Sequence, residues 1–319
     1  MKIDKFILWF GVILLLVGTI TFGAAFALSG FRFDFLSNIK TVTKRFEEST
    51  DNPIQSVSID FENANVEVRI ENGTDAFAIE YPQLQNKKGE NVSEIKLEEK
   101  NGAISIVENY QWQDHLFSWN FQNPTLVLYL PQERVYALDL QADTGEIRFT
   151  SGNLNVSKIT LKATTGDIST KDCAISSTGE ARFETTTGDI NVGELSAQTV
   201  VLKTTTGDLT AHKALKAETS LSLKATTGTI KTLGAITAET ITAQTSTGDL
   251  KLTGNVYANA ITFKMTTGVL TARIAGKKAD YSIVVSHSTG DSNLSTQTGG
   301  TKTLNVSCTT GDIYVVFAE

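Results

Sequence analysis

Apolar and polar residues alternate in nine similar stretches between residue 138 and the end of the chain. Each stretch leads into a Thr-Gly pair, with apolar residues seven and five positions before the glycine and a mostly polar residue four positions before it. A period of two is typical of a half-buried β-strand, and no stretch shows the i, i+3, i+4, i+7 apolar pattern of a helix. The glycines are Gly145, Gly166, Gly188, Gly207, Gly228, Gly248, Gly268, Gly290 and Gly311.

The spacing of these glycines predicts how the strands are assembled. Successive glycines are 19 to 22 residues apart, and a second apolar position follows two residues after each one, broken only at Ser292, where Leu294 is expected to take its place. A constant period near twenty is typical of a solenoid, in which each repeat buries its apolar side by stacking on its neighbours. We therefore expect an all-β, single-stranded β-solenoid of about nine coils, with glycine at each tight corner.

An aspartate follows six of the corner glycines and suggests two roles. The six are Asp167, Asp189, Asp208, Asp249, Asp291 and Asp312. A column of carboxylates could bind Ca²⁺, but Thr229 and Val269 interrupt it, and the period is far from the nine residues of calcium-binding repeats. We expect each aspartate to accept backbone N–H bonds within its own turn, and we predict no metal and no cofactor.

Catalytic chemistry has little support in the sequence. The histidines His115, His212 and His287 are scattered without metal-ligand spacing. His287-Ser288 with Asp291 has the composition of a catalytic triad, but His287 and Ser288 occupy ordinary repeat columns, the former pointing inward. The coils also lack the long loops that would build a cleft, so a polysaccharide-active enzyme is the least favoured alternative and a non-catalytic protein is predicted.

The amino-terminal end predicts a membrane anchor. Phe6–Leu28 is an uncharged, mostly apolar run that would be about 34 Å long as a helix, enough to span a bilayer. Residues 1–30 are therefore expected to form a retained single-pass anchor with a short tail. A cleaved signal peptide is the alternative, since Ala25-Phe26-Ala27 resembles a cleavage site.

The charges around this run bear on orientation. Lys2 and Lys5 favour a cytoplasmic amino end and hence an extracellular solenoid, although basic residues after the run weaken the asymmetry. Residues 31–53 lack strong alternation and are expected to be a juxtamembrane linker.

The remaining domain boundaries follow from the strand pattern. Residues 54–137 are expected to form a β-rich amino-terminal part that begins the solenoid with wider coils and caps it, and residues 138–319 the regular solenoid. Asn63–Val66 has the composition of a degenerate corner. Ile313–Phe317 is expected to be the final strand, with no obvious cover for its outer edge.

One aromatic segment departs from the repeat and is the candidate binding site. It contains Trp112, Phe117 and Trp119. Exposed, these side chains would form a partner-binding patch, because aromatic anchors dominate interface energetics. Buried, they would plug the amino-terminal coils.

Charge and cysteine content limit the classes of partner. The net charge of −7, the pI near 5.2 and the lack of an evident basic stripe argue against nucleic-acid binding. Cys173 and Cys308 lie too many rungs apart for a disulfide, so both should be free thiols.

Several of these motifs together resemble a known family. They are the amino-terminal span, Asn63-Ala64-Asn65-Val66-Glu67-Val68, Leu126-Val127-Leu128-Tyr129-Leu130-Pro131 before Leu138-x-Leu140, and the Thr-Gly-Asp-Ile repeats. Over about residues 55–319 the chain is similar to the bacterial β-strand-repeat family of unknown function labelled "putative adhesin". The resemblance implies a β-solenoid, often tethered to the membrane and facing outward, and it offers no catalytic residues.

Two functions follow as expectations. The first is a membrane-anchored, cell-surface structural or interaction module, adhesin-like and non-catalytic, which presents a rigid face to an envelope component or another protein. The second is an accessory or sensor protein of envelope-stress signalling that binds a membrane partner.

Overall fold

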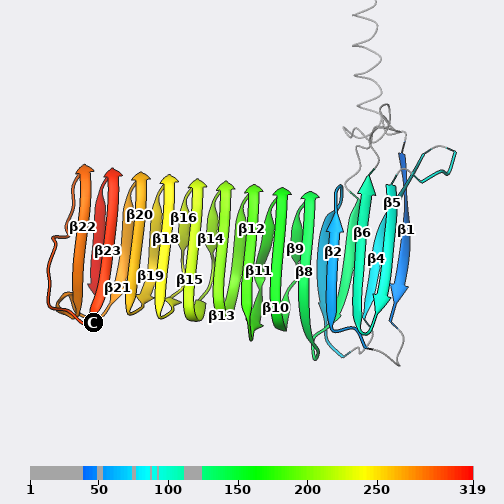
Figure 1. Cartoon of the computed structure of the whole chain (residues 1–319), viewed down its shortest axis with the longest axis horizontal. Coiled ribbons are helices and arrows are strands. Elements are labelled where there is room, and N and C mark those ends of the chain that lie inside the picture. Colours follow the sequence, from blue (N-terminus) through cyan, green and yellow to red (C-terminus); the bar gives the residue numbers. More distant parts are fainter. Residues whose placement is uncertain are drawn as a thin grey trace, which may run out of the picture. The chain divides into compact units, whose positions relative to one another are not determined.

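The computed structural model describes residues 39–48, 53–73, 77–86, 88–91, 93–110 and 124–318. The chain divides into two compact units. The first comprises Met1–Val42, Gln83–Glu94 and Tyr110–Asn123, and the second comprises Thr43–Pro82, Ile95–Asn109 and Pro124–Glu319. The second unit is an all-β solenoid, which confirms the predicted fold class (Figure 1).

The strands fall into an amino-terminal group and a regular group. The first group is β1 (Ile39–Glu47), β2 (Ser56–Phe61), β3 (Asn65–Glu71), β4 (Ala78–Asn86), β5 (Ser93–Lys100), β6 (Ala103–Tyr110) and β7 (Thr125–Pro131). The regular group starts with β8 (Val135–Thr144), β9 (Ile147–Phe149), β10 (Gly152–Thr165), β11 (Ile168–Ser177), β12 (Glu180–Thr187), β13 (Ile190–Thr206), β14 (Leu209–Ala211), β15 (Leu215–Thr227) and β16 (Ile230–Thr232). It continues with β17 (Ile236–Thr237), β18 (Thr240–Thr247), β19 (Leu250–Tyr257), β20 (Ala260–Thr267), β21 (Leu270–Ala275), a 3₁₀ turn at Lys278–Asp280, β22 (Tyr281–Thr289), β23 (Lys302–Thr310) and β24 (Ile313–Ala318).

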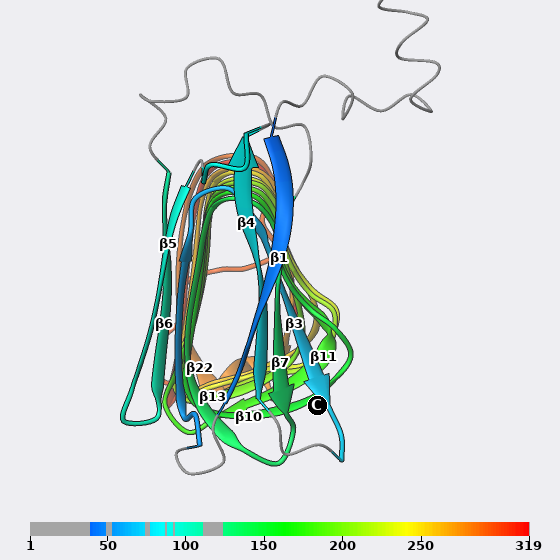
Figure 2. The same cartoon turned by 90° about the vertical axis from the view of Figure 1, so that its right-hand side faces the viewer.

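Parallel, in-register pairing stacks one coil on the next. Leu202 on β13 lies between Phe183 on β12 and Leu223 on β15, and the same register holds along the three strands. Viewed along the stack, successive coils trace nested outlines around a common interior (Figure 2). The predicted stacking of rungs is therefore confirmed.

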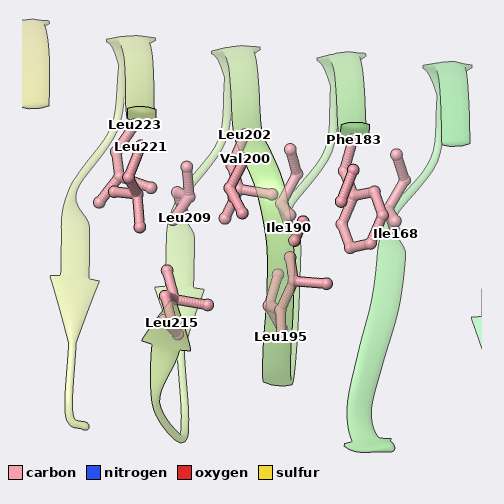
Figure 3. Close-up of a cluster of buried hydrophobic side chains, with 14 of the residues drawn as sticks. Ile168, Phe183, Ile190, Leu195, Val200, Leu202, Leu209, Leu215, Leu221 and Leu223 are labelled. Atoms are coloured by element: carbon pink, nitrogen blue, oxygen red, sulfur yellow. The ribbon is translucent and has the colours of Figure 1, made fainter. Parts of the chain in front are cut away.

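The interior is filled by the apolar columns that the repeat predicted. The side chains seven and five positions before each corner glycine, and two after it, are almost all buried. Phe183, Ile190, Leu202 and Leu209 are fully buried and point from different walls toward the same core (Figure 3). Leu294 is also buried, as expected where Ser292 breaks the column.

The corners are built on glycine because the coils approach closely there. Gly228 has a φ of +143°, and a Cβ at this position would lie 1.9 Å from the carbonyl oxygen of Gly207 in the preceding coil. Its N–H donates to Thr247 O of the following coil at 2.9 Å. All nine corner glycines stack in one column in this manner.

The coils do not follow one another in sequence order at the carboxyl end. β23 pairs with β20 on one side and with β22 on the other, so the last repeat is inserted between the seventh and the eighth. No strand follows Gly290 directly, so within the described residues the solenoid has eight complete regular turns and a ninth that stops at its corner. This corrects the expected order of coils.

The expectation of an uncovered final strand is also wrong. β24 pairs with β21 on one side, and on the other Asn293 exchanges hydrogen bonds of 2.9 Å with the backbone of Val315. The segment 290–301 then crosses the end of the solenoid, visible as a single orange trace in Figure 2. Gln297 pairs with Ile283 of β22, which covers part of that edge strand.

The amino-terminal strands extend the same stack. β2 pairs in parallel with β8 and β6, and β3 pairs in parallel with β9 and β7. A Cβ on Gly145 would meet Ala64 O, which confirms Asn63–Val66 as a corner. β4 then runs antiparallel to β7, so the sheet changes direction here rather than adding wider parallel coils.

The structure describes part of the predicted linker, but neither the predicted membrane anchor nor the aromatic segment. Within the expected linker 31–53, residues 39–47 form β1, a strand whose largely polar sequence concealed its alternation. Phe6–Leu28 and the segment with Trp112, Phe117 and Trp119 lie outside the described residues. In the described part of the chain, no helix is both long and apolar enough to cross a membrane.

Candidate functional site

The aspartate column links neighbouring coils. Oδ1 of Asp167 accepts the N–H of Asp189 at 2.7 Å, Asp189 accepts that of Asp208, and Asp208 accepts that of Thr229. The predicted role as a backbone acceptor is thus correct, but the N–H group belongs to the next coil rather than to the same turn. Among the described residues, no group of three or more His, Cys, Asp or Glu side chains could hold a metal ion.

The residues with triad-like composition lie at the end of the solenoid. His287, Ser288 and Asp291 are all exposed, because they belong to the outermost, eighth repeat. His287 nevertheless occupies the inward column, in register with the buried Cys308. The backbone N–H of Asp291 donates to Asp312, so this aspartate takes its place in the corner ladder.

The two cysteines are free thiols, as predicted, and both are buried. Burial raises the pKa of the Cys173 thiol to about 12, and its Sγ donates to the carbonyl of Thr150. Burial also raises the pKa of Cys308. Neither thiol is placed to act as a nucleophile, because the reactive thiolate is disfavoured.

A row of lysines runs along the outer face of β10, β13, β15 and β20, and we call it the lysine stripe. It consists of Lys162, Lys203, Lys224 and Lys264, all at the position four residues before the corner glycine and all exposed. Lys203 and Lys224 are direct partners in the register of β13 and β15, so they stand on adjacent rungs about 4.8 Å apart. Glu184 separates Lys162 from Lys203, and Gln244 separates Lys224 from Lys264.

The charges around the stripe leave it basic. Glu184 pairs with Arg182 at 2.9 Å, and Arg182 also pairs with Glu180 at 2.7 Å. Among the described residues, no carboxylate lies within ion-pair distance of the four lysines. The outward positions eight, six and four residues before the glycine, from β10 to β20, carry six basic and two acidic side chains. These are Lys158, Lys162, Arg182, Lys203, Lys224 and Lys264, and Glu180 and Glu184.

The face around the stripe is rich in hydroxyl groups and slightly hollowed. Threonines fill most positions next to the lysines toward the corner, and a hollow of about 250 Å³ is lined by Lys162, Thr164, Glu184 and Lys203, among others. Lysine and threonine side chains on a flat sheet can donate to several anionic or hydroxyl-bearing groups at once. The expectation of no basic stripe is therefore wrong for this face, because stacking collects successive lysines that lie 21 to 41 residues apart in the sequence.

A second feature is a groove on another edge of the coils, which we call the alanine groove. Its volume is about 550 Å³, and small, buried alanines line its floor at Ala217, Ala238 and Ala258. The residues before the alanines form one side, and those after them form the other. The first side is Lys216, Thr237 and Tyr257, and the second is Glu218, Glu239 and Asn259.

The sides of the groove are exposed and polar except for one aromatic ring. Tyr257 is 45% exposed, and its hydroxyl accepts a hydrogen bond from Asn255 Nδ2 at 3.2 Å. Ala275, Gly276 and Lys302 also line the groove, and Lys302 Nζ lies 5.5 Å from the centre of the Tyr281 ring. The alanine that recurs ten or eleven positions before Gly228, Gly248 and Gly268 was the sequence signal for this groove.

A cluster of charges and one tyrosine joins β1, β3, β4 and β7. Arg45 and Arg69 lie on the ring of Tyr129 at 5.3 and 5.5 Å, and Tyr129 donates to Glu80 at 3.1 Å. The hydrogen bond from Arg45 lowers the pKa of Glu80, while burial and the bond to Glu80 raise the pKa of Tyr129. These side chains form hydrogen bonds, ion pairs and cation–π contacts with one another across four strands. The cluster therefore stabilises the packing of the amino-terminal strands.

A nearly buried ion pair has the same structural role. Glu48 is 5% exposed and pairs with Arg134 at 2.5 Å. Its two carboxylate oxygens also accept the backbone N–H groups of Ile54 and Phe77. The pair therefore connects the end of β1 with the start of β2, the start of β4 and the turn before β8.

Three of the solved structures that match this chain are from bacteria. A putative adhesin from Bacteroides fragilis is 12% identical over 87% of this chain and 97% of its own, with a TM-score of 0.38. A putative cell adhesion protein from Clostridium sporogenes is 11% identical over 88% and 100%, with a TM-score of 0.29. A putative adhesin from Parabacteroides distasonis is 10% identical over 86% and 97%, with a TM-score of 0.33. Scores at this level carry no argument about function.

No curated protein matches the chain. The family model described as Toastrack DUF4097 matches residues 54–214, just over half of the 319 residues. This stretch includes the first four corner glycines, the strands β2 to β7 and two lysines of the stripe. The chain belongs to the Toastrack DUF4097 family.

Proposed function

We propose that this protein is a membrane-anchored, cell-surface interaction module that binds an anionic polymer of the cell envelope through the lysine stripe, without catalysis. The observation that carries the proposal is the row Lys162, Lys203, Lys224 and Lys264 on a chain whose net charge is −7. Concentrating positive charge on one face of an acidic protein favours a linear polyanion over a compact anion, because the charges lie in a line.

The rigidity of the solenoid supports this mode of binding. The stripe lies on strands paired on both sides, so its lysines are held at fixed rung spacing while the side chains remain free to adapt. Fixed spacing lowers the entropy cost of aligning several contacts at once. The threonines beside the stripe add hydrogen bonds to phosphate or hydroxyl groups.

A charge-matched pair of variants tests the stripe. In the first, Lys203, Lys224 and Lys264 are replaced by Gln. In the control, Lys171, Lys213 and Lys231, which are exposed on other faces, are replaced by Gln, so both variants lose three positive charges. Each lysine near an anionic surface contributes about 1 kcal/mol, so the first variant should bind roughly 100-fold more weakly and the control much less so.

The probe is poly(glycerol phosphate), titrated into detergent-solubilised full chain at two salt concentrations. The affinity of the wild type should fall as salt rises, because binding a polyanion releases its counterions. Equal losses in both variants, or binding that does not respond to salt, would refute the role of the stripe.

The location of the solenoid is tested separately. With the anchor at residues 1–30 and a cytoplasmic amino end, a protease added to intact cells should reach the chain outside the membrane. Protection in intact cells combined with cleavage after lysis would place the solenoid inside.

A further inference from the structure

We propose that the alanine groove is a second binding site, which takes an uncharged, linear oligosaccharide. The groove is separate from the lysine stripe and differs from it in chemistry. Its sides carry two basic residues, Lys216 and Lys302, and two acidic ones, Glu218 and Glu239, so its net charge is close to zero. A polyanion gains little in such a groove, whereas a neutral ligand rich in hydroxyl groups finds donors and acceptors on both sides.

The size and direction of the groove fit a short chain of sugar rings. Its volume of about 550 Å³ lies in the range of roughly 300–1,000 Å³ that is usual for ligand sites. Lys216, Thr237 and Tyr257 are partners in successive rungs, so this side advances by about 4.8 Å per coil. A pyranose ring in an extended chain advances by a comparable distance, so each ring can face one rung.

Tyr257 supplies the surface on which a sugar ring would stack. It is one of the few large apolar side chains in the described structure that remain exposed, and Asn255 Nδ2 donates to its hydroxyl at 3.2 Å. The C–H groups on the face of a pyranose ring pack well on an aromatic face, and binding sites combine such a ring with a few placed polar groups.

The opposite side and the floor supply the rest of the site. Glu218, Glu239 and Asn259 are exposed and can accept or donate hydrogen bonds to sugar hydroxyls. The buried alanines Ala217, Ala238 and Ala258 lie between the two sides and line the floor of the groove. The geometry therefore combines an aromatic platform, a polar side and a shallow, small-residue floor.

The experiment uses full chain in detergent and isothermal titration calorimetry with three defined probes. The neutral probes are the tetramers of N-acetylglucosamine and of β-1,4-linked glucose, and the charged comparator is tetragalacturonate. At least one neutral tetramer should bind with an affinity that does not change with salt. Binding of tetragalacturonate alone, or of neither neutral tetramer at millimolar concentration, would overturn the proposal.

Four variants locate the site. Tyr257→Ala should weaken binding about tenfold, as expected for loss of a ring contact, while Tyr257→Phe keeps the ring and should stay within about twofold of wild type. Tyr314→Ala is the matched control, because Tyr314 is 44% exposed on a different face, and it should have no effect. Glu239→Gln removes acceptor capacity from the opposite side and should also weaken binding.

The variants also separate this proposal from the function of the stripe. The triple lysine variant should bind the neutral tetramer as wild type does, so the two sites can fail independently. Equal losses in Tyr257→Ala and Tyr314→Ala, or wild-type affinity in both Tyr257→Ala and Glu239→Gln, would show that the groove is not the site. Circular dichroism of each variant confirms that the solenoid is folded.

Discussion

Replacing Gly228 by alanine tests whether the corners are held by close approach between coils. The substitution adds a single methyl group, but the Cβ would lie 1.9 Å from Gly207 O and 2.6 Å from Gly207 C. These are backbone atoms, so no side chain can rotate away. The matched control is Gly299→Ala, because Gly299 has a φ of +106° with nothing within 4 Å of an added Cβ.

The expected cost follows from the geometry of the corner. Both substitutions place alanine at positive φ, which costs roughly 1–2 kcal/mol. At Gly228, the two corners must also separate by about 1 Å, which stretches three hydrogen bonds beyond their useful length at about 1 kcal/mol each. These bonds run from the N–H groups of Gly207, Leu209 and Thr229 to Thr227 O, Thr229 O and Asp208 Oδ1. We therefore expect a total of roughly 4–5 kcal/mol for Gly228→Ala and 1–2 kcal/mol for Gly299→Ala.

Urea unfolding, followed by the β-strand signal in circular dichroism, measures the free-energy cost of both substitutions. With a slope of about 3 kcal/mol per molar urea, the difference of about 3 kcal/mol moves the midpoint of Gly228→Ala about 1 M below that of the control. Coincident unfolding curves would refute the reasoning, because strain at positive φ would then account for the whole effect and stacking at the corner for none.

Three further substitutions or treatments have defined outcomes. Glu48→Ala should destabilise the protein by about 3 kcal/mol or more in urea unfolding, because Arg134 loses its nearly buried partner, and addition of Arg134→Leu should recover part of the loss. Asp208→Asn should unfold like wild type, since its side-chain oxygen still accepts Thr229 N–H, whereas Asp208→Ala should cost about 1–2 kcal/mol; equal costs would contradict the ladder. Cys173, with a pKa of about 12, should resist a thiol reagent at pH 8 until urea unfolds the chain, and rapid labelling of the native protein would contradict its burial.

The repeat made most of the solenoid predictable, because each structural requirement recurs at the same position. The corner glycines, the inward columns at Leu202 and Ile190 and the aspartates all reappear every twenty residues or so. One copy of such a pattern is weak evidence for a solenoid, but nine copies are compatible with few other folds. The acceptor role of Asp208 was also predictable, although which coil supplied the N–H was not, since both choices satisfy the same turn chemistry.

The two binding surfaces were harder to predict because they depend on which coils become neighbours. Lys203 and Lys224 are twenty-one residues apart and become adjacent only when the register of β13 and β15 is known. Tyr257 occupies a position where neighbouring repeats have Thr237 and Lys216. Because aromatic residues do not recur at this position, the repeat pattern did not predict the groove's aromatic side chain. Net charge averages over all faces, and it therefore concealed a basic face on an acidic chain.

The order of the terminal coils follows from a different physical requirement: the backbone N–H and C=O groups at the edge of a sheet need hydrogen-bond partners. A repeat pattern states that coils stack, but it does not state that β23 enters between β20 and β22. Had the eighth and ninth repeats followed in sequence, the strongly apolar β24 would have ended the sheet with an open edge, a template for pairing with another chain. With the insertion, β24 is covered by Asn293 and the outermost strand is β22, which carries polar residues at its end and accepts the crossing segment through Gln297. The same arrangement occurs at the amino-terminal end of the solenoid. β2 lies between β6 and β8 in the stack, although it precedes both of them in the chain. Inserting the last coil between earlier ones covers both edges of the apolar strand β24. The lateral faces, which carry the stripe and the groove, remain open to partners.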